Sequence, residues 1–363
     1  MKVFLVAGAR PNFMKIAPIY HAAVGRAGLE CLIVHTGQHY DYEMSQAFFD
    51  DLELPRPDFF LEAGSGSHAE QTARIMVAFE KVCLEQKPDL VMVVGDVNST
   101  LACSVVAKKL WIKVAHVEAG LRSFDLSMPE EINRMVTDAV SDYFFVTEES
   151  AVRNLEHEGK AADRIFFVGH VMIDNLLRQV ERLKEIDGRN FSVWPLKEKL
   201  AGRAYLFLTL HRPANVDDAK VLGGIVAALN QLAQKYPIFF PVHPRTGKML
   251  QRFGLKLDEN IMPLQPLGFL ESLFLWRDAF LVLTDSGGLQ EETTALGVPC
   301  LTLRDNTERP ITVELGTNRL VGSHPQAILG ACAEYEKDRP RPRPAPPLWD
   351  GRAAYRIWEK LGT

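Results

Sequence analysis

Short apolar runs alternate along this chain with longer segments whose apolar residues recur three and four positions apart. The pattern occurs in two successive series. The first series has apolar runs at 2–7, 30–35, 89–95, 113–118, 142–146 and 164–168, and the second at 204–210, 237–242, 260–264, 279–284 and 298–303. Such alternation is typical of βαβ units on a parallel sheet. The sequence therefore predicts an α/β protein with two Rossmann-like, doubly wound halves.

The pattern loosens between the two series, from about residue 171 to 203, and a length of 363 residues also favours two domains. We expect an N-terminal domain of residues 1–169 plus 350–363 and a C-terminal domain of residues 170–349. The proline-rich tract 339–347 is expected to cross between them in an extended form. It leads to a short terminal helix that could pack against the first domain.

The composition limits the possible binding partners and the cellular compartment of the protein. A formal net charge of −5 argues against nucleic acid or an anionic membrane as a partner. The cysteines are scattered without a C-x-x-C pair, which is typical of reduced thiols and not of a disulfide framework or a zinc site. No apolar stretch approaches the roughly 18 residues that cross a bilayer, and the N-terminus lacks the features of a signal peptide. We expect a soluble cytoplasmic protein without a bound metal.

In open parallel sheets ligands bind beyond the carboxyl ends of the strands, so polar residues that follow apolar runs are the candidates. After the first run, Arg10 and Lys15 offer positive charge where a helix N-terminus would favour an anion. No G-x-G-x-x-G fingerprint is present there. Asp96 ends the run 89–95, and the residues after it, Asn98 and Ser99, are equally explained as helix caps.

Glu118 lies in an otherwise apolar run, and glutamate is rarely buried without a partner. Either Arg122 or Arg134 neutralises it structurally, or its carboxylate reaches into a site; we favour the site. Glu130 and Glu131 follow Pro129, which suits the first turn of a helix, where the macrodipole favours carboxylates whatever their function. For Glu131 we favour that structural role.

In the second half, His211 with Arg212 and His243 with Arg245 form two similar corners at the ends of apolar runs. A single histidine is more often structural than catalytic. Two histidine–arginine corners together indicate a positively charged lining for an anion.

The stretch "LTDSGGLQEETTALGVP" (283–299) combines bare backbone with carboxylates. Ser286, Gly287 and Gly288 can present N–H groups to a phosphate at a helix start, and glycine lets a diphosphate approach closely. Glu292, one turn on, would suit a vicinal diol. Arg309 adds a further anion ligand. Diphosphate plus ribose indicates a nucleotide sugar, although a glycine-rich turn with acidic residues in its first helical turn would explain the same letters.

Taken together, "GARPNFMKIAPI", "VVGDVNST", "HVEAGLRSFD", "MPEEINR", "VGHVMIDNL", "LTLHRPAN", "TDSGGLQEE" and "RDNTERP" occur in the order and spacing of the non-hydrolysing UDP-N-acetylglucosamine 2-epimerases, which this chain closely resembles. The resemblance implies a glycosyltransferase-B arrangement with the active site in the cleft between the domains. It further implies a homodimer that needs no cofactor and supplies a precursor for cell-surface polysaccharide.

The same resemblance implies roles for individual residues. Asp96, Glu118 and Glu130 would be the catalytic carboxylates, with Lys15 and Arg134 nearby. Ser286, Gly287 and Gly288 would hold the diphosphate and Glu292 the ribose. Arg10, His211 and Arg309 would complete the phosphate lining, with His211 counted among the catalytic residues. Phe269 is the candidate to stack on uracil, and Gln38, Arg74 and His243 are candidates for a second, regulatory UDP-sugar site.

The chemistry explains why several carboxylates are needed. The C2 proton of UDP-N-acetylglucosamine is not acidic, so an epimerase without a hydride acceptor must first weaken the C1–O bond. Elimination would give 2-acetamidoglucal and UDP, and re-addition would give UDP-N-acetylmannosamine. Basic groups would stabilise the departing diphosphate, and carboxylates would move protons on the two faces of C2.

Other functions remain open. A glycosyltransferase of the same architecture would share the glycine cradle, but would not need the three carboxylates of the first domain. A hydrolysing epimerase would release free N-acetylmannosamine, and a non-catalytic sensor would bind without turnover. The exact UDP-sugar is also open, because related enzymes act on oxidised or diamino sugars.

Overall fold

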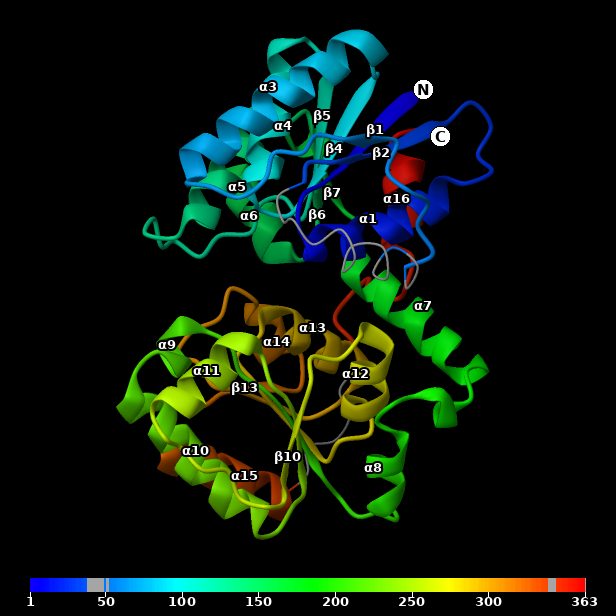
Figure 1. Cartoon of the computed structure of the whole chain (residues 1–363). Helices are drawn as coiled ribbons and strands as arrows, with labels where there is room; N and C mark the ends of the chain where they lie inside the picture. Colours follow the sequence, from blue (N-terminus) through cyan, green and yellow to red (C-terminus); the bar gives the residue numbers. More distant parts are fainter. Residues whose placement is uncertain (38–48, 50–51, 339–343, 363) are drawn as a thin grey trace. The chain divides into compact units, whose positions relative to one another are not determined.

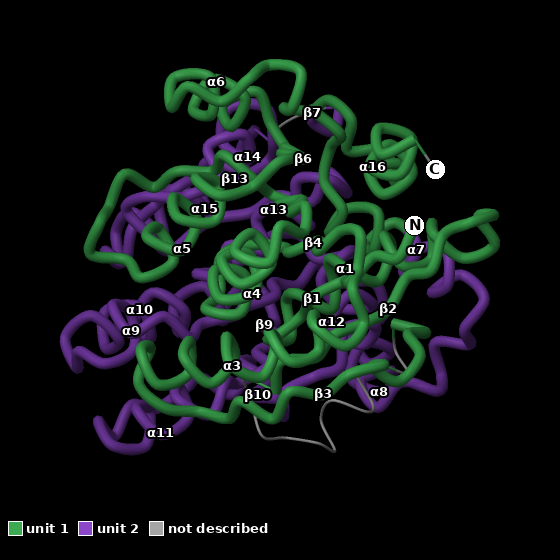
Figure 2. Tube along the Cα trace, turned by 90° about the horizontal axis from the view of Figure 1, so that it is seen from above, with its two compact units in different colours: residues 1–177, 347–363 green, residues 178–346 purple. Residues whose placement is uncertain are grey.

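A computed structural model of the chain describes residues 1–37, 49, 52–338 and 344–362, and it resolves two compact units (Figure 1). Unit 1 comprises Met1–Leu177 together with Pro347–Thr363, and unit 2 comprises Arg178–Pro346 (Figure 2). The expected boundaries were residues 170 and 350. The two units meet inside a helix, α7 (Val171–Glu185), and inside the proline-rich tract, between Pro346 and Pro347.

Unit 1 is built on a seven-stranded sheet in which every pairing is parallel, in the order β3-β2-β1-β4-β5-β6-β7. Its strands are β1 (Lys2–Ala7), β2 (Glu30–His35), β3 (Phe59–Phe60), β4 (Leu90–Val94), β5 (Lys113–Val117), β6 (Tyr143–Val146) and β7 (Ile165–Phe167). This is the doubly wound order, and it reverses between β1 and β4. The carboxyl ends of these two strands therefore flank the crevice in which a ligand is expected.

Helices cover both faces of this sheet. They are α1 (Arg10–Ala23), α3 (His68–Gln86), α4 (Asn98–Lys109), α5 (Pro129–Val140), α6 (Glu149–His157), the short 3-10 helix η1 (Ala162–Arg164), α7 and α16 (Ala353–Lys360). Successive residues of β1 alternate between the faces, as strand geometry requires: Leu5 packs into the core under α1 and α16, and Phe4 into the core under α3 and α4. Figure 1 shows these two helix pairs on opposite sides of the sheet.

Unit 2 repeats the plan with a six-stranded parallel sheet in the order β10-β9-β8-β11-β12-β13. The strands are β8 (Leu206–Thr209), β9 (Ile238–Pro241), β10 (Ile261–Leu264), β11 (Leu281–Thr284), β12 (Cys300–Thr302) and β13 (Asn318–Leu320). The order reverses between β8 and β11. The residues that follow these two strands, from His211 and from Asp285 onward, therefore lie at the second switch point.

The helices of unit 2 share a core with its sheet. They are the 3-10 helix η2 (Gly188–Asn190), α8 (Trp194–Lys199), α9 (Pro213–Val216), α10 (Ala219–Ala233), α11 (Pro244–Arg252), α12 (Phe269–Trp276), α13 (Gly287–Leu296), α14 (Pro310–Glu314) and α15 (Pro325–Lys337). Leu208 and Leu283 pack with α10 and α15 on one side of the sheet. Trp276 of α12 is almost fully buried.

The C-terminal helix α16 belongs to unit 1 and packs against α1. The Trp358 indole Nε1 donates to the Ile19 carbonyl at 2.8 Å. Asp174, on α7, accepts hydrogen bonds from Ala353 N at 3.1 Å and Ala354 N at 2.7 Å, two of the N–H groups that a helix start leaves without intrahelical acceptors. Residues 339–343 of the proline-rich tract lie outside the described residues.

Among the described residues no helix combines the length and apolar character needed to span a membrane. The five cysteines are all free thiols.

Candidate functional site

The loop after β1 is fixed by Asn12, a residue that the sequence analysis had not singled out. Its Oδ1 accepts from Gly8 N at 3.2 Å and from Ala9 N at 2.9 Å, and its Nδ2 donates to the Val94 carbonyl at 3.0 Å. This side chain therefore ties the ends of β1 and β4 together at the switch point. Arg10, the first residue of α1, remains exposed beside it.

Lys15 and Glu118 form a buried ion pair. Lys15 Nζ donates to Glu118 Oε2 at 2.5 Å, and only 8% and 2% of the two side chains are exposed. The sequence analysis left open, without favouring it, that Arg122 or Arg134 neutralises Glu118. In the structure these arginines pair with other carboxylates, Arg122 with Asp138 and Glu158 and Arg134 with Asp96 and Glu131. Lys15 could not be recognised as the partner from the sequence because it lies 103 positions away.

The backbone around this pair is strained. Glu118 has a φ of 67°, in the left-handed region that side-chain-bearing residues rarely occupy and that often marks functional sites. Gly95, with a φ of 66°, faces the pair: a Cβ added there would lie 2.8 Å from Lys15 Nζ. Glycine is thus required at the end of β4 for the ammonium to approach.

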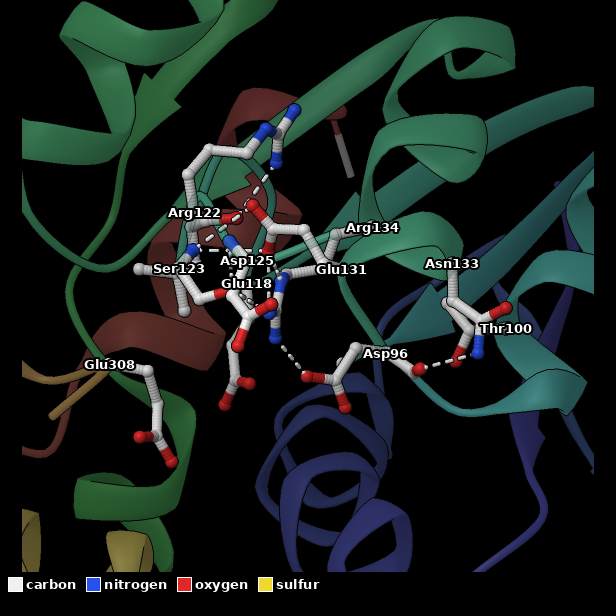
Figure 3. Close-up of polar contacts among 12 residues, drawn as sticks. Asp96, Thr100, Glu118, Arg122, Ser123, Asp125, Glu131, Asn133, Arg134 and Glu308 are labelled. Atoms are coloured by element: carbon white, nitrogen blue, oxygen red, sulfur yellow. Dashed lines mark hydrogen bonds and ion pairs between the residues drawn. The ribbon is translucent and has the colours of Figure 1, made fainter. Parts of the chain in front are cut away.

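Arg134, on α5, joins Asp96 to Glu131 (Figure 3). Its Nη1 contacts Asp96 Oδ2 at 2.5 Å, and its Nε and Nη2 donate to Glu131 Oε2 at 2.9 Å and 2.6 Å. Glu131 also accepts from the backbone N–H groups of Ser123 and Phe124. Burial alone would raise the pKa of Glu131, but these hydrogen bonds and the Arg134 charge hold that pKa below its ordinary value. Glu131 therefore orders the loop before α5.

Glu130 lies next to this structural carboxylate but is exposed. Its side chain forms no hydrogen bond or ion pair with any of the described residues. Asp96 is intermediate, with 30% of its side chain exposed. The structure thus brings together Lys15, Glu118, Gly95, Asp96 and Arg134 but leaves Glu130 turned to solvent.

A second, fully buried network lies behind these residues. His116 Nδ1 contacts Asp138 Oδ1 at 2.6 Å, and His116 Nε2 lies 2.8 Å from the Gly95 carbonyl. Asp138 also accepts from Gly120 N at 3.0 Å and pairs with Arg122 at 2.7 Å. Burial alone would raise the pKa of Asp138, but His116 and Arg122 hold it below its ordinary value. His116 therefore fixes the loop at Gly95.

In unit 2 the carboxylate of Asp285 organises the switch point. It follows β11, is fully buried, and contacts His211 Nδ1 at 2.9 Å. It also accepts hydrogen bonds from the backbone N–H groups of His211 and Arg212 and from Asn215 Nδ2. Burial alone would raise the pKa of Asp285, but His211 and the Arg212 N–H hold it below its ordinary value. The sequence analysis assigned no role to Asp285, although it meets the same strand-end criterion that identified Asp96.

The predicted phosphate cradle begins α13. Ser286 is the N-cap residue of this helix and Gly287 its first residue. The Glu308 carboxylate lies over this helix start, since a Cβ added at Gly287 would be 2.9 Å from Glu308 Oε1. Glu308 pairs with Arg304 at 2.7 Å and Arg212 at 3.4 Å. Burial alone would raise the pKa of Glu308, but the Arg304 hydrogen bond and the Arg309 and Arg304 charges lower it to about 2.

Further along α13, Glu291 and Glu292 differ in their environment. Arg309 Nε lies 2.8 Å from Glu291 Oε1. Burial, together with the Glu291 charge, raises the pKa of Glu292 to about 8. A neutral carboxyl group both donates and accepts hydrogen bonds, which suits recognition of hydroxyl groups. Of the two glutamates, Glu291 is the one held in an ion pair with Arg309.

The remaining predicted residues divide between the two units. His243 is the N-cap residue of α11, and its ring centroid lies 5.7 Å from that of His211. Phe269, the first residue of α12, is half-buried. Arg74, on α3, donates to the Ser65 carbonyl at 2.8 Å, and Gln38 lies outside the described residues.

No group of three or more His, Cys, Asp or Glu side chains that could hold a metal ion is present within the described ranges. The polar groups of both switch points are instead arranged as ion pairs and hydrogen-bond donors. Such an arrangement can bind an anion and transfer protons.

Comparison with known proteins gives the family. The sequence profile described as UDP-N-acetylglucosamine 2-epimerase matches residues 22–362. UDP-N-acetylglucosamine 2-epimerase of Methanocaldococcus jannaschii is 45% identical over 338 residues, which cover 91% of each chain. UDP-2,3-diacetamido-2,3-dideoxy-D-glucuronate 2-epimerase of Pseudomonas aeruginosa is 43% identical over 365 residues, which cover 99% of each chain.

Solved structures agree. The M. jannaschii UDP-GlcNAc 2-epimerase in complex with UDP-GlcNAc and UDP has a TM-score of 0.85 at 42% identity, covering 100% of this chain and 99% of that one. The Neisseria meningitidis UDP-GlcNAc 2-epimerase bound to UDP-GlcNAc has a TM-score of 0.88 at 30% identity, covering 99% of both.

Two doubly wound units, each with charged side chains at its switch point, place the protein in the class of two-domain α/β enzymes with a glycosyltransferase-B-like fold. The profile match over nearly the whole chain and the identities above 40% narrow this class. The chain belongs to the UDP-N-acetylglucosamine 2-epimerase family.

Proposed function

We propose that this protein catalyses the reversible 2-epimerisation of UDP-N-acetylglucosamine to UDP-N-acetylmannosamine through elimination and re-addition of UDP. The observation that carries the proposal is the buried Lys15–Glu118 pair, held by a strained backbone at the switch point beside Asp96. A carboxylate that is buried, charge-paired and conformationally strained is a common feature of catalytic sites.

In the proposed reaction the C1–O electrons leave with UDP, and the electrons of the C2–H bond form the C1–C2 double bond of 2-acetamidoglucal. Asp96, Glu118 and Glu130 stabilise the positive charge that develops at C1 and transfer the proton at C2. Lys15 and Arg134 form ion pairs with Glu118 and Asp96 and hold their carboxylates in place. Return of a proton to the opposite face, with re-addition of UDP at C1, completes the inversion.

Unit 2 is proposed to bind the nucleotide. The N–H groups at the start of α13, from Ser286 to Gly288, receive the diphosphate, as helix N-termini do for anions generally. His211, Arg309 and, from unit 1, Arg10 add positive charge. Glu292 binds the ribose hydroxyls and Phe269 stacks on uracil. We also propose that His243, Arg74 and Gln38 belong to a second, regulatory site that binds the same UDP-sugar.

The test is proton NMR of the purified protein with UDP-N-acetylglucosamine in D2O. We expect UDP-N-acetylmannosamine labelled with deuterium at C2, in equilibrium with labelled substrate. Glu118→Gln should abolish the exchange, and Glu149→Gln, a surface change on α6, should not. Release of free N-acetylmannosamine and UDP would identify a hydrolysing epimerase, whereas an unchanged spectrum would contradict the proposed reaction.

A second candidate substrate comes from the name of one relative. The P. aeruginosa relative, named for UDP-2,3-diacetamido-2,3-dideoxy-D-glucuronate, is 43% identical over 99% of both chains, and the M. jannaschii relative is 45% identical over 91% of both. The same experiment with this UDP-sugar decides between the two, because the preferred substrate will exchange its C2 proton at the higher kcat/KM.

The proposal also includes a homodimer, a cytoplasmic location and a role in supplying precursors for cell-surface polysaccharide. The five free thiols support a reducing compartment. Size-exclusion chromatography coupled to light scattering tests the dimer, whose measured mass should be twice the 40.7 kDa of the single chain.

A further inference from the structure

The position of Asp285 is unexpected in a site that is proposed to bind a diphosphate. Asp285 directly precedes Ser286, the N-cap residue of α13, so its negative charge lies beside the predicted phosphate cradle. Fixed negative charge there would oppose an anionic ligand. An aspartate at this position therefore needs a reason that outweighs this repulsion.

The contacts of Asp285 give that reason. Its two oxygens accept from the backbone N–H groups of His211, at 3.1 Å and 3.0 Å, and of Arg212, at 2.8 Å. Asn215 Nδ2 donates at 3.2 Å, and the same amide group donates to the Leu303 carbonyl at 2.8 Å. The fourth contact is His211 Nδ1 at 2.9 Å. The carboxylate is thus held against the loop after β8.

This contact decides which histidine nitrogen is available to a ligand. An ionised carboxylate only accepts hydrogen bonds, so the hydrogen on His211 must be at Nδ1 when the ring is neutral. Nε2 is then the nitrogen left for substrate. The His211 side chain is 38% exposed, and Asp285 is fully buried behind it.

We propose that Asp285 is a positioning residue that holds His211 with Nδ1 toward the buried carboxylate, so that Nε2 of the imidazolium donates a hydrogen bond to the diphosphate as the C1–O bond breaks. The chemical part rests on the proposed function; the orientation of the ring does not. Asp285 also stabilises the imidazolium charge, as an aspartate behind a histidine does in hydrolytic triads.

Other charged groups also lie near His211. Arg212 follows it in the chain, and His243, the N-cap residue of α11, has its ring 5.7 Å away. Arg245 lies two residues beyond His243 and pairs with Asp217. Glu308 pairs with Arg212. Among these groups Asp285 is the carboxylate in direct contact with the His211 ring, at 2.9 Å, and it is therefore the group that sets the orientation of that ring.

The first test needs no turnover. Nitrogen-15 NMR of labelled histidine rings in the resting protein should show neutral His211 in the Nδ1–H form, with its signals assigned by their loss in His211→Gln. UDP titration should perturb Nε2. In Asp285→Asn the amide can turn its NH2 toward Nδ1, so we expect the Nε2–H form. A wild-type ring already in the Nε2–H form would overturn the proposal, whether or not the variant folds.

The second test uses kinetics. Asp285→Asn should lower kcat about 100-fold, the scale of a lost acid–base group, and should shift the pH profile of kcat/KM. If Asp285 acts through His211, the double variant will be no slower than His211→Gln alone. Multiplied losses would indicate a separate structural role and contradict the proposal. Asp278→Asn, which removes the exposed carboxylate of a pair with Lys197 in the same unit, is the matched control and should leave kcat and the ring unchanged.

The two tests separate the two proposals. A wild-type protein that fails to exchange the C2 proton but has an Nδ1–H ring that responds to UDP at Nε2 would contradict the proposed reaction and support the positioning role. Turnover together with a His211 ring in the Nε2–H form would support the proposed reaction and contradict the positioning role of Asp285.

Discussion

At the scale of single residues, the two switch points hold buried glutamates in different surroundings. Lys15 forms an ion pair with Glu118 at 2.5 Å, and both side chains are buried. Burial, together with the Glu291 charge, raises the pKa of Glu292 to about 8. One buried glutamate is thus paired with a cation, and the other lies near a second carboxylate.

The raised pKa of Glu292 predicts a pH dependence of stability. Its ordinary pKa is 4.5, so between that value and about 8 the folded protein holds a proton that the unfolded chain releases. The stabilisation from this group is full below pH 4.5 and is lost as the pH rises through about 8. Urea unfolding at pH 5, 7 and 9 should therefore show a smaller decline for Glu292→Gln than for the wild type. Equal declines in the two proteins would contradict the assignment.

Glu308 predicts an effect on ligand affinity. Its carboxylate lies over the first residue of α13, where the diphosphate is expected, and is held there by Arg304 and Arg212. An incoming diphosphate must displace this internal anion. Glu308→Gln should therefore bind UDP more tightly, by about fivefold for roughly 1 kcal/mol of relieved competition, as measured by calorimetry. Weaker binding would mean instead that Glu308 orients the two arginines. Glu314→Gln, at the end of α14, serves as the control.

At the scale of elements, the short α16 shows how a terminal segment contributes to stability. Trp358 is fully buried and hydrogen-bonded to Ile19 of α1. Trp358→Ala should lower the free energy of unfolding of unit 1 by about 3 to 5 kcal/mol, as tryptophan truncations in cores do. Tyr355→Ala, on the exposed face of the same helix, should change it by less than about 0.5 kcal/mol. Chemical denaturation followed by circular dichroism gives both values, and similar losses in the two variants would contradict this role of α16.

Strands could be predicted from the sequence where the pattern of apolar residues alone determines them. Buried parallel strands are continuous apolar runs, so β1, β4 and β11 could be located from the sequence. Two strands were missed: β3 has only two residues, Phe59–Phe60, and β13, Asn318–Leu320, is largely polar. Both lie at sheet edges, where one neighbour is absent and the demand for apolar residues is weaker.

At the scale of the whole molecule, what could not be predicted is pairing between distant segments. The strand-end rule identified Asp96, Glu118 and His211 as candidates, because it depends only on local order. It could not show that Lys15 would face Glu118 or that Asp285 would hold His211, since these pairs lie 103 and 74 positions apart. Local pattern thus locates the switch points, and only the fold shows how charges are matched there.

Because the chain divides into two units, we expect two kinds of variant: one that loses catalysis and one that loses UDP affinity. The carboxylates proposed for chemistry lie in unit 1, and the helix start and Glu292 proposed for the nucleotide lie in unit 2. Glu118→Gln and Asp96→Asn should therefore lose C2 proton exchange while their UDP affinity stays unchanged. Glu292→Ala should weaken UDP about tenfold, the effect of losing roughly 1.4 kcal/mol of hydrogen bonding to the ribose. Calorimetry with UDP and deuterium exchange on the same preparations measure both quantities. A unit 1 carboxylate variant that loses UDP affinity as severely as Glu292→Ala would show that nucleotide binding and chemistry are not divided between the units.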